Sequence, residues 1–175
     1  MHSERTAWQT RRAAFACVLL SAACAGAEPA RENDLKAAFV FNFAVFTEWP
    51  AEVLAGGAPI NLCAGASNPM LAALNQLNDK LVNGHRIAVH SGQLRGCHVL
   101  VLDRHDRARW PQIKRDLAGA NVLTVSDDRS ISGDGAVIAL SVEDQRVGFD
   151  IDTGAARGAR LNLSSKLLRL ARSVQ

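Results

Sequence analysis

The fold is decided by Cys97-His98-Val99-Leu100-Val101-Leu102-Asp103 and, further along the chain, by Asn121-Val122-Leu123-Thr124-Val125-Ser126-Asp127. Each is a short, nearly continuous apolar run ending in aspartate, which is typical of a strand buried on both faces of a parallel sheet. The polar segment 107–117 between the two runs predicts a helix. A strand, a helix and a second strand in this order indicate an α/β fold.

Further strands are expected on both sides of this pair, over residues 59–64, 85–90, 136–142 and 146–151. The last two are joined by only three residues, which predicts an antiparallel hairpin. Helices are expected over 34–49 (ended by Pro50), 67–77, 154–161 and 164–174, with Ser164 capping the last one. We therefore expect an α/β three-layer sandwich, with a mostly parallel mixed sheet of about five to six strands, a C-terminal antiparallel hairpin, and helices on its faces.

The first 27 residues have the layout of a cleavable secretory signal. Arg11 and Arg12 precede an uncharged apolar run that ends at the small-residue site Ala25-Gly26-Ala27. The run is too short for a transmembrane helix. A buried N-terminal helix and lipidation at Cys24 are the weaker alternatives. We expect export to the periplasm, with residues 1–27 removed and residues 28–175 forming a single domain.

Cleavage changes the charge of the protein. The mature chain holds 17 basic and 16 acidic residues, a net charge of +1, because three arginines and one glutamate leave with the signal. Nucleic-acid binding needs a strongly basic surface. This composition therefore gives no support for a nucleic-acid partner.

Two cysteines, Cys63 and Cys97, remain in the mature chain. An even number of cysteines in an oxidising compartment favours a disulfide, which would close a loop of about 35 residues and add roughly 3–4 kcal/mol to stability. Two buried free thiols are the alternative.

A search for catalytic motifs finds none that we would assign. Gly133-Asp134-Gly135 precedes a strand rather than a helix, so it predicts a turn and not a dinucleotide loop. His85 and His90 should face opposite sides of one strand, so they do not form a metal site. We expect no enzyme activity, no cofactor and no metal.

Asp103 and Asp127 are the best candidates for a small-ligand site. Both end buried strands, and ligands of open α/β sheets collect at that edge. Aspartate is also a common turn residue after a strand, so this remains an alternative function.

Four pieces of the mature chain, in order, resemble the YfiR-type (YfiR/HmsC-like) family of periplasmic proteins. The pieces are Lys36-Ala37-Ala38-Phe39-Val40-Phe41-Asn42-Phe43 through Phe46-Thr47-Glu48-Trp49-Pro50; Cys63 with residues 97–102; residues 122–127; and residues 147–152 with 155–157 and 161–171. The resemblance implies a small α/β repressor that binds the periplasmic sensor region of an inner-membrane diguanylate cyclase, lowers cyclic di-GMP and so controls biofilm formation. It also implies a homodimer, and an outer-membrane peptidoglycan-binding lipoprotein that can sequester the repressor. One departure is that no cysteine follows Cys97, whereas some relatives carry a second, late disulfide.

The segment 149–168, with the residue after it, is our predicted partner-binding surface. It interleaves arginines with apolar side chains, a composition found in interface hot spots. The residues are Phe149, Ile151, Arg157, Arg160, Leu161, Leu163, Leu168 and Arg169.

Overall fold

The two runs that decide the fold form adjacent parallel strands at the centre of the sheet. In the computed structural model, which describes residues 27–143 and 146–175, β5 (Val99–Leu102) pairs in parallel with β6 (Leu123–Ser126). Every side chain of both strands is buried. The predicted signal peptide, residues 1–27, lies outside the described residues but for Ala27.

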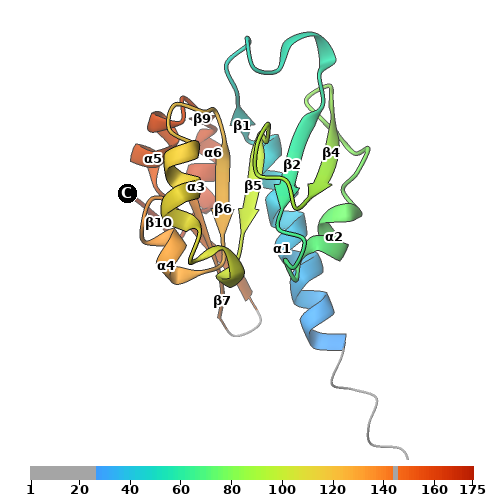
Figure 1. Cartoon of the computed structure of the whole chain (residues 1–175), viewed down its shortest axis with the longest axis vertical. Helices are drawn as coiled ribbons and strands as arrows, with labels where there is room; N and C mark the ends of the chain where they lie inside the picture. Colours follow the sequence, from blue (N-terminus) through green and yellow to red (C-terminus); the bar gives the residue numbers. More distant parts are fainter. Residues whose placement is uncertain (1–26, 144–145) are drawn as a thin grey trace, which may run out of the picture. The chain divides into compact units, whose positions relative to one another are not determined.

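An eight-stranded sheet surrounds this pair, in the order β10-β8-β7-β6-β5-β2-β4-β3 (Figure 1). Strands β4, β2, β5, β6 and β7 are mutually parallel, β3 is antiparallel to β4, and β8 is antiparallel to β7. The remaining bounds are β2 Ile60–Ala64, β3 Leu81–Val82, β4 His85–Ser91, β7 Ile138–Glu143, β8 Arg146–Ile151 and β10 Ser173–Val174. A separate two-stranded sheet joins β1 (Thr47–Glu48) to β9 (Asn162–Leu163).

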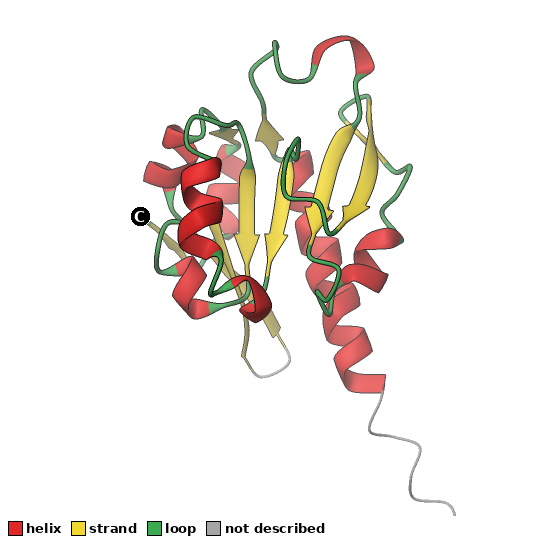
Figure 2. Ribbon diagram, in the orientation of Figure 1, coloured by secondary structure: helices red, strands yellow, loops and turns green. Residues whose placement is uncertain are grey.

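Helices cover both faces of the sheet, which gives three layers (Figure 2). Alternate side chains of β5 enter two separate cores, because successive strand residues point to opposite faces. Val99 and Val101 pack with α1 (Ala27–Val45), α2 (Leu71–Asn75) and α6 (Ser165–Leu170). Leu100 and Leu102 pack with α3 (Trp110–Asp116) and α4 (Arg129–Ser132). The last helix, α5 (Thr153–Gly158), follows β8 directly and contributes Ala156 to the first core.

The expected α/β class, the mostly parallel mixed sheet and the C-terminal hairpin are confirmed. The sheet is wider than the five to six strands that we expected, because β3 and β10 add two residues each at its two edges. Strands this short carry no alternation of polar and apolar residues, so the sequence gives no signal for them.

The first helix ends earlier than predicted. We expected it to continue to Trp49, but α1 ends at Val45 and the chain turns into β1. The Thr47 hydroxyl donates to the Phe43 carbonyl oxygen at 2.7 Å, and Thr47 pairs with Leu163 in β9. The helical prediction for residues 46–49 was wrong because tertiary strand pairing outweighs local helix periodicity.

The last helix is also shorter than expected. Ser164 caps α6 as predicted, with its hydroxyl accepting from the Lys166 backbone N–H at 3.3 Å. The helix stops at Leu170 rather than at Val174, and the chain continues as β10 alongside β8. The Arg172 backbone N–H donates to the Phe149 carbonyl at 2.9 Å, so the free edge of β8 captures the end of the chain.

Candidate functional site

An apolar groove of about 860 Å³ lies between α1, the beginning of β8 and α6. Leu170, two-thirds exposed at 67%, lies on its rim. The apolar lining is Phe39, Phe43, Phe46, Val147, Phe149, Leu167 and Leu170, and the polar lining includes Asn42, Glu143, Arg146 and Arg172.

Three phenylalanine rings form the floor of the groove. The ring centroids of Phe43 and Phe149 are 4.9 Å apart, and Phe39 lies 6.1 Å from Phe43 and 6.0 Å from Phe149, all edge to face. This geometry is the favoured one for aromatic pairs. Phe43 is fully buried and Phe39 is only partly buried. The floor of the groove therefore extends from the core to the surface.

Arg172 closes one side of the groove. Its guanidinium bonds Glu143 at 3.0 Å and Asp150 at 2.6 Å, and these hydrogen bonds raise its pKa above the usual value. The side chain crosses the backbone of β8 at Gly148, where any Cβ would come within 2.7 Å of the Arg172 Cδ. Glycine at position 148 is therefore what lets Arg172 tie the hairpin to the C-terminal strand.

The predicted partner-binding residues fall into three groups by exposure. Phe149, Ile151 and Leu161 are buried in the first core and are 3%, 1% and 6% exposed. Leu163 and Leu168 are partly exposed. The exposed members are Arg157 on α5, Arg160 after α5, and Arg169 on α6. The accessible part of the predicted surface is therefore three arginines with two partly buried leucines.

Arg160 is held in an uncommon conformation. Its φ of 54° lies in the left-handed region, just after the end of α5, where glycine or asparagine is usual. Its guanidinium bonds Glu52 at 3.3 Å and the Asn121 side-chain oxygen at 3.1 Å, and its side chain is 60% exposed. Arg157 makes a weaker contact, a 3.4 Å hydrogen bond to the Thr153 hydroxyl.

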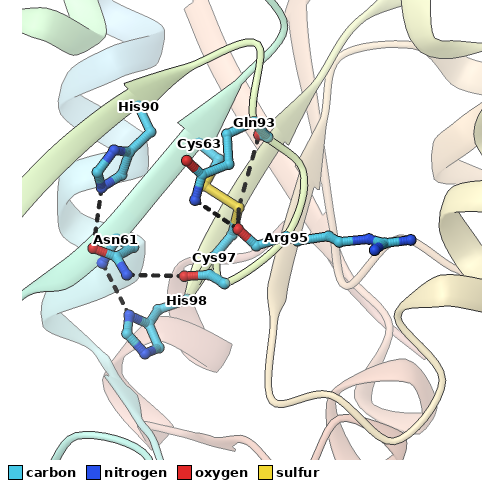
Figure 3. The surroundings of a disulfide bond; sticks show 8 residues. Asn61, Cys63, His90, Gln93, Arg95, Cys97 and His98 are labelled. Atoms are coloured by element: carbon cyan, nitrogen blue, oxygen red, sulfur yellow. Dashed lines mark hydrogen bonds between the residues drawn. A yellow bond between two sulfur atoms is a disulfide. The ribbon is translucent and has the colours of Figure 1, made fainter.

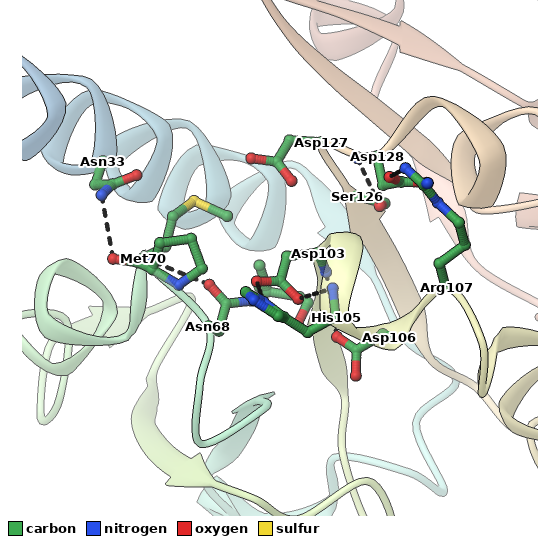
Figure 4. Close-up of polar contacts among 12 residues, drawn as sticks. Asn33, Asn68, Met70, Asp103, His105, Asp106, Arg107, Ser126, Asp127 and Asp128 are labelled. Carbon is green, nitrogen blue, oxygen red and sulfur yellow. Dashed lines mark hydrogen bonds and ion pairs between the residues drawn. The ribbon is translucent and has the colours of Figure 1, made fainter.

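Both aspartates of the predicted small-ligand site make hydrogen bonds within the protein, and Figure 4 shows those of Asp103. Asp103 is 3% exposed and caps the turn after β5, accepting from the His105 backbone N–H at 3.0 Å and lying 2.8 Å from the His105 ring. Asp127 accepts from the Lys36 ammonium at 2.8 Å. The strand-edge carboxylates therefore stabilise turns and a helix in this structure.

Lys36 is a buried cation that the sequence analysis did not single out. It is 8% exposed and bonds both Asp127 and Glu32, at 2.8 Å and 2.7 Å. Burial by itself lowers the pKa of Lys36, but the two carboxylates more than offset this and the pKa is raised. Lys36 is the first residue of the first of the four pieces that carry the family resemblance. The sequence gives no indication that it pairs with Asp127, 91 residues further along the chain.

Cys63 and Cys97 are joined by a disulfide, with their Cα atoms 5.8 Å apart (Figure 3). The bond links β2 to the loop that precedes β5. Beside it, Asn61 of β2 contacts His90 on β4 and His98, which directly precedes β5. The spacing of histidines along one strand does not predict this arrangement, because the two histidines come from separate segments of the chain.

Within residues 27–143 and 146–175, no group of three or more His, Cys, Asp or Glu side chains is placed to hold a metal ion. The helices of this described part are also all too short or too polar to cross a membrane.

The described part of the chain is a three-layer α/β domain with an apolar groove, exposed arginines and internally paired carboxylates. The chain belongs to the YfiR/HmsC-like family, whose sequence profile matches residues 33–172. At the level of the family, this membership supports a regulator of cyclic di-GMP signalling that acts in the periplasm.

A solved structure has a similar fold. It is described as a conserved domain protein from Vibrio cholerae O1 biovar El Tor str. N16961, and it superposes with a TM-score of 0.54 at 10% sequence identity. The match covers 82% of this chain but only 60% of the Vibrio chain. At this identity the similarity shows a shared fold and nothing about partners.

Proposed function

We propose that this protein is a periplasmic repressor that binds the periplasmic sensor region of an inner-membrane diguanylate cyclase and lowers cyclic di-GMP output. Family membership supports the regulatory class. The observation that carries the contact surface is the exposure of three arginines, Arg157, Arg160 and Arg169, in one short segment with the partly exposed Leu163 and Leu168.

The proposed contact surface consists of Arg157, Arg160, Leu163, Leu168 and Arg169. Arginine next to partly buried apolar side chains is typical of interface hot spots, because the guanidinium binds carboxylates while the leucines exclude water. Phe149, Ile151 and Leu161, which the sequence analysis included, support this surface from the core. The groove is lined by Leu167 and Leu170 of α6, the helix that also carries Leu168 and Arg169.

The genetic test uses the full-length gene in its own cell. Deletion should raise cyclic di-GMP and biofilm formation, and Arg157→Glu should reproduce the deletion while the protein is still exported at its normal level. Arg86→Glu is the matched control, since Arg86 is an exposed arginine on β4, near the opposite edge of the sheet. Unchanged cyclic di-GMP in the deletion strain, with the cyclase expressed, would overturn the repressor hypothesis.

The binding test uses the purified mature protein and the purified periplasmic region of the cyclase. Replacing a hot-spot arginine weakens binding by about 30-fold or more. We expect this loss for Arg157→Glu, Arg160→Glu and Arg169→Glu and no loss for Arg86→Glu. Equal affinity for all of these proteins would move the contact surface elsewhere.

We also propose two further partners. One is a second copy of this chain in a homodimer, and the other is a peptidoglycan-binding lipoprotein that sequesters the repressor. Size-exclusion chromatography with light scattering decides the first. Co-purification of the lipoprotein with the wild type but not with Arg157→Glu would support shared use of the contact surface.

A further inference from the structure

Asn61 is the centre of a hydrogen-bond cluster next to the disulfide, which we name the Asn61 latch (Asn61, His90, Gly96 and His98; Figure 3). The Asn61 backbone N–H donates to His98 Nδ1 at 2.9 Å, and the Asn61 carbonyl accepts from the His98 backbone N–H at 2.8 Å. The Asn61 side-chain amide donates to the Gly96 carbonyl at 2.9 Å, and its oxygen lies 3.1 Å from His90 Nε2. One residue thus connects β4, the disulfide loop and the start of β5.

The two histidines of the latch respond differently to acid. His98 Nδ1 accepts a hydrogen bond, so it carries no proton. Protonation of Nδ1 would place its N–H opposite the Asn61 backbone N–H, two donors without an acceptor, and the hydrogen bond would be lost. His90 donates from Nε2 to the Asn61 oxygen, and a protonated His90 keeps that bond. The latch therefore opens on protonation of His98 and not of His90.

The surroundings of His98 favour its neutral form. Burial, and then the proximity of His85, lower the pKa of His98 below its usual value of 6.5. The titratable and charged groups on the elements around the latch are His85 and His90 of β4, Arg95 of the disulfide loop and Asp116 of α3, and the last two line the same 760 Å³ cavity as His98. His98 is thus neutral at pH 7 and gains its proton only in acid.

A chain of contacts leads from His98 to the proposed contact surface. The His98 ring packs edge to face with Trp49, with centroids 6.5 Å apart. Trp49 Nε1 donates to the Asn121 carbonyl at 3.1 Å, and the Asn121 side chain bonds Arg160 at 3.1 Å and the Ala159 carbonyl at 2.9 Å. Trp49 also directly follows β1, which pairs with β9.

We propose that the Asn61 latch is an acid-sensitive switch: protonation of His98 breaks its bond to the Asn61 N–H, displaces the ring against which Trp49 packs, and so changes the surface around Arg160. The link to partner binding rests on the proposed function, whereas the opening of the latch does not. Acidification of the periplasm would then release the partner.

The first experiment measures the latch in the purified mature protein, without a partner. Tryptophan fluorescence between pH 8 and pH 4 should change with a midpoint below 6.5, and Trp49→Phe should remove the change. His98→Gln keeps an acceptor for the Asn61 N–H but does not titrate, so it should also remove the change. His90→Gln, the matched control, should preserve it.

A second readout covers the case in which His98→Gln does not fold. In the wild-type protein, the NMR shift of the Asn61 amide should titrate together with the His98 ring. A fluorescence change that persists in a folded His98→Gln, or an Asn61 amide that does not follow His98, would overturn the latch.

The coupling is measured with the purified periplasmic region of the cyclase. Binding by the wild type should weaken at least about fivefold between pH 7.5 and pH 5, the lower end of typical allosteric coupling, and binding by His98→Gln should not. Equal wild-type affinity at both values would overturn the coupling. Absence of binding at either pH would refute the proposed function, while the fluorescence titration still decides the latch.

Discussion

Removal of the Cys63–Cys97 disulfide by the double change Cys63→Ala, Cys97→Ala should destabilise the protein strongly. The bond joins residues 34 positions apart, and closing a loop of that length restricts the unfolded chain by roughly 3–4 kcal/mol. Cys63 is fully buried and Cys97 is 5% exposed, so alanine also removes sulfur contacts from the core. We expect a total loss of about 3–5 kcal/mol in the free energy of unfolding.

Urea unfolding of the mature protein at pH 7.5, followed by circular dichroism, measures this loss. The variant should also show a larger dependence on urea, because its unfolded chain is less restricted and exposes more surface. Wild-type protein treated with a reductant is the control, and it should unfold near the midpoint of the variant. Serine at both positions should cost about 1–3 kcal/mol more than alanine, since it buries hydroxyl groups.

Two results would contradict this reasoning. A loss below about 1 kcal/mol would mean that the loop is already restricted in the unfolded chain. A reductant that leaves the wild-type midpoint unchanged would mean that the two thiols are not bonded in the native protein.

Four further predictions concern single residues. Gly148→Ala should displace Arg172 and lower stability by about 1 kcal/mol, since two exposed ion pairs are lost; Gly158→Ala, in a helix with open space around it, should instead raise stability by about 0.4–1 kcal/mol in the same urea experiment. Phe43→Ala should cost about 3–5 kcal/mol, because the side chain is fully buried between two other rings, and a cost near zero would contradict the packing described. The pKa of His98 is lowered in the folded protein, so the unfolded chain binds a proton more readily. The contribution of His98 to stability is therefore complete above pH 6.5 and is lost as the pH falls below that value. If the urea midpoint of His98→Gln depended on pH as strongly as that of the wild type, this prediction would be wrong.

Local patterns made much of the fold predictable. The apolar runs at 97–103 and 121–127 indicated buried parallel strands, and three residues between two further strands indicated the hairpin. Ser164 could be recognised as a helix cap because capping depends on residues only two or three positions away. The family resemblance, carried by four pieces of sequence, is matched by the family profile over residues 33–172.

The candidate site was predictable only in part. The sequence named Arg157, Arg160 and Arg169 but left open whether apolar members such as Ile151 lie in the core, and in the structure Phe149 and Ile151 are buried. The groove was not predicted, because its walls come from α1, β8 and α6, which are distant in the chain.

The sequence by itself determined the features that depend on patterns of neighbouring residues, namely the α/β class, the central parallel strands and the hairpin. Only the tertiary structure decided that Thr47 pairs with Leu163, that Lys36 bonds Asp127 and that Asn61 contacts His90 and His98. The physical reason is that periodicity reports which face of an element is apolar, but not which element covers that face. Contacts between residues tens of positions apart form only when the helices and strands pack, and the proposed surface and its switch consist of such contacts.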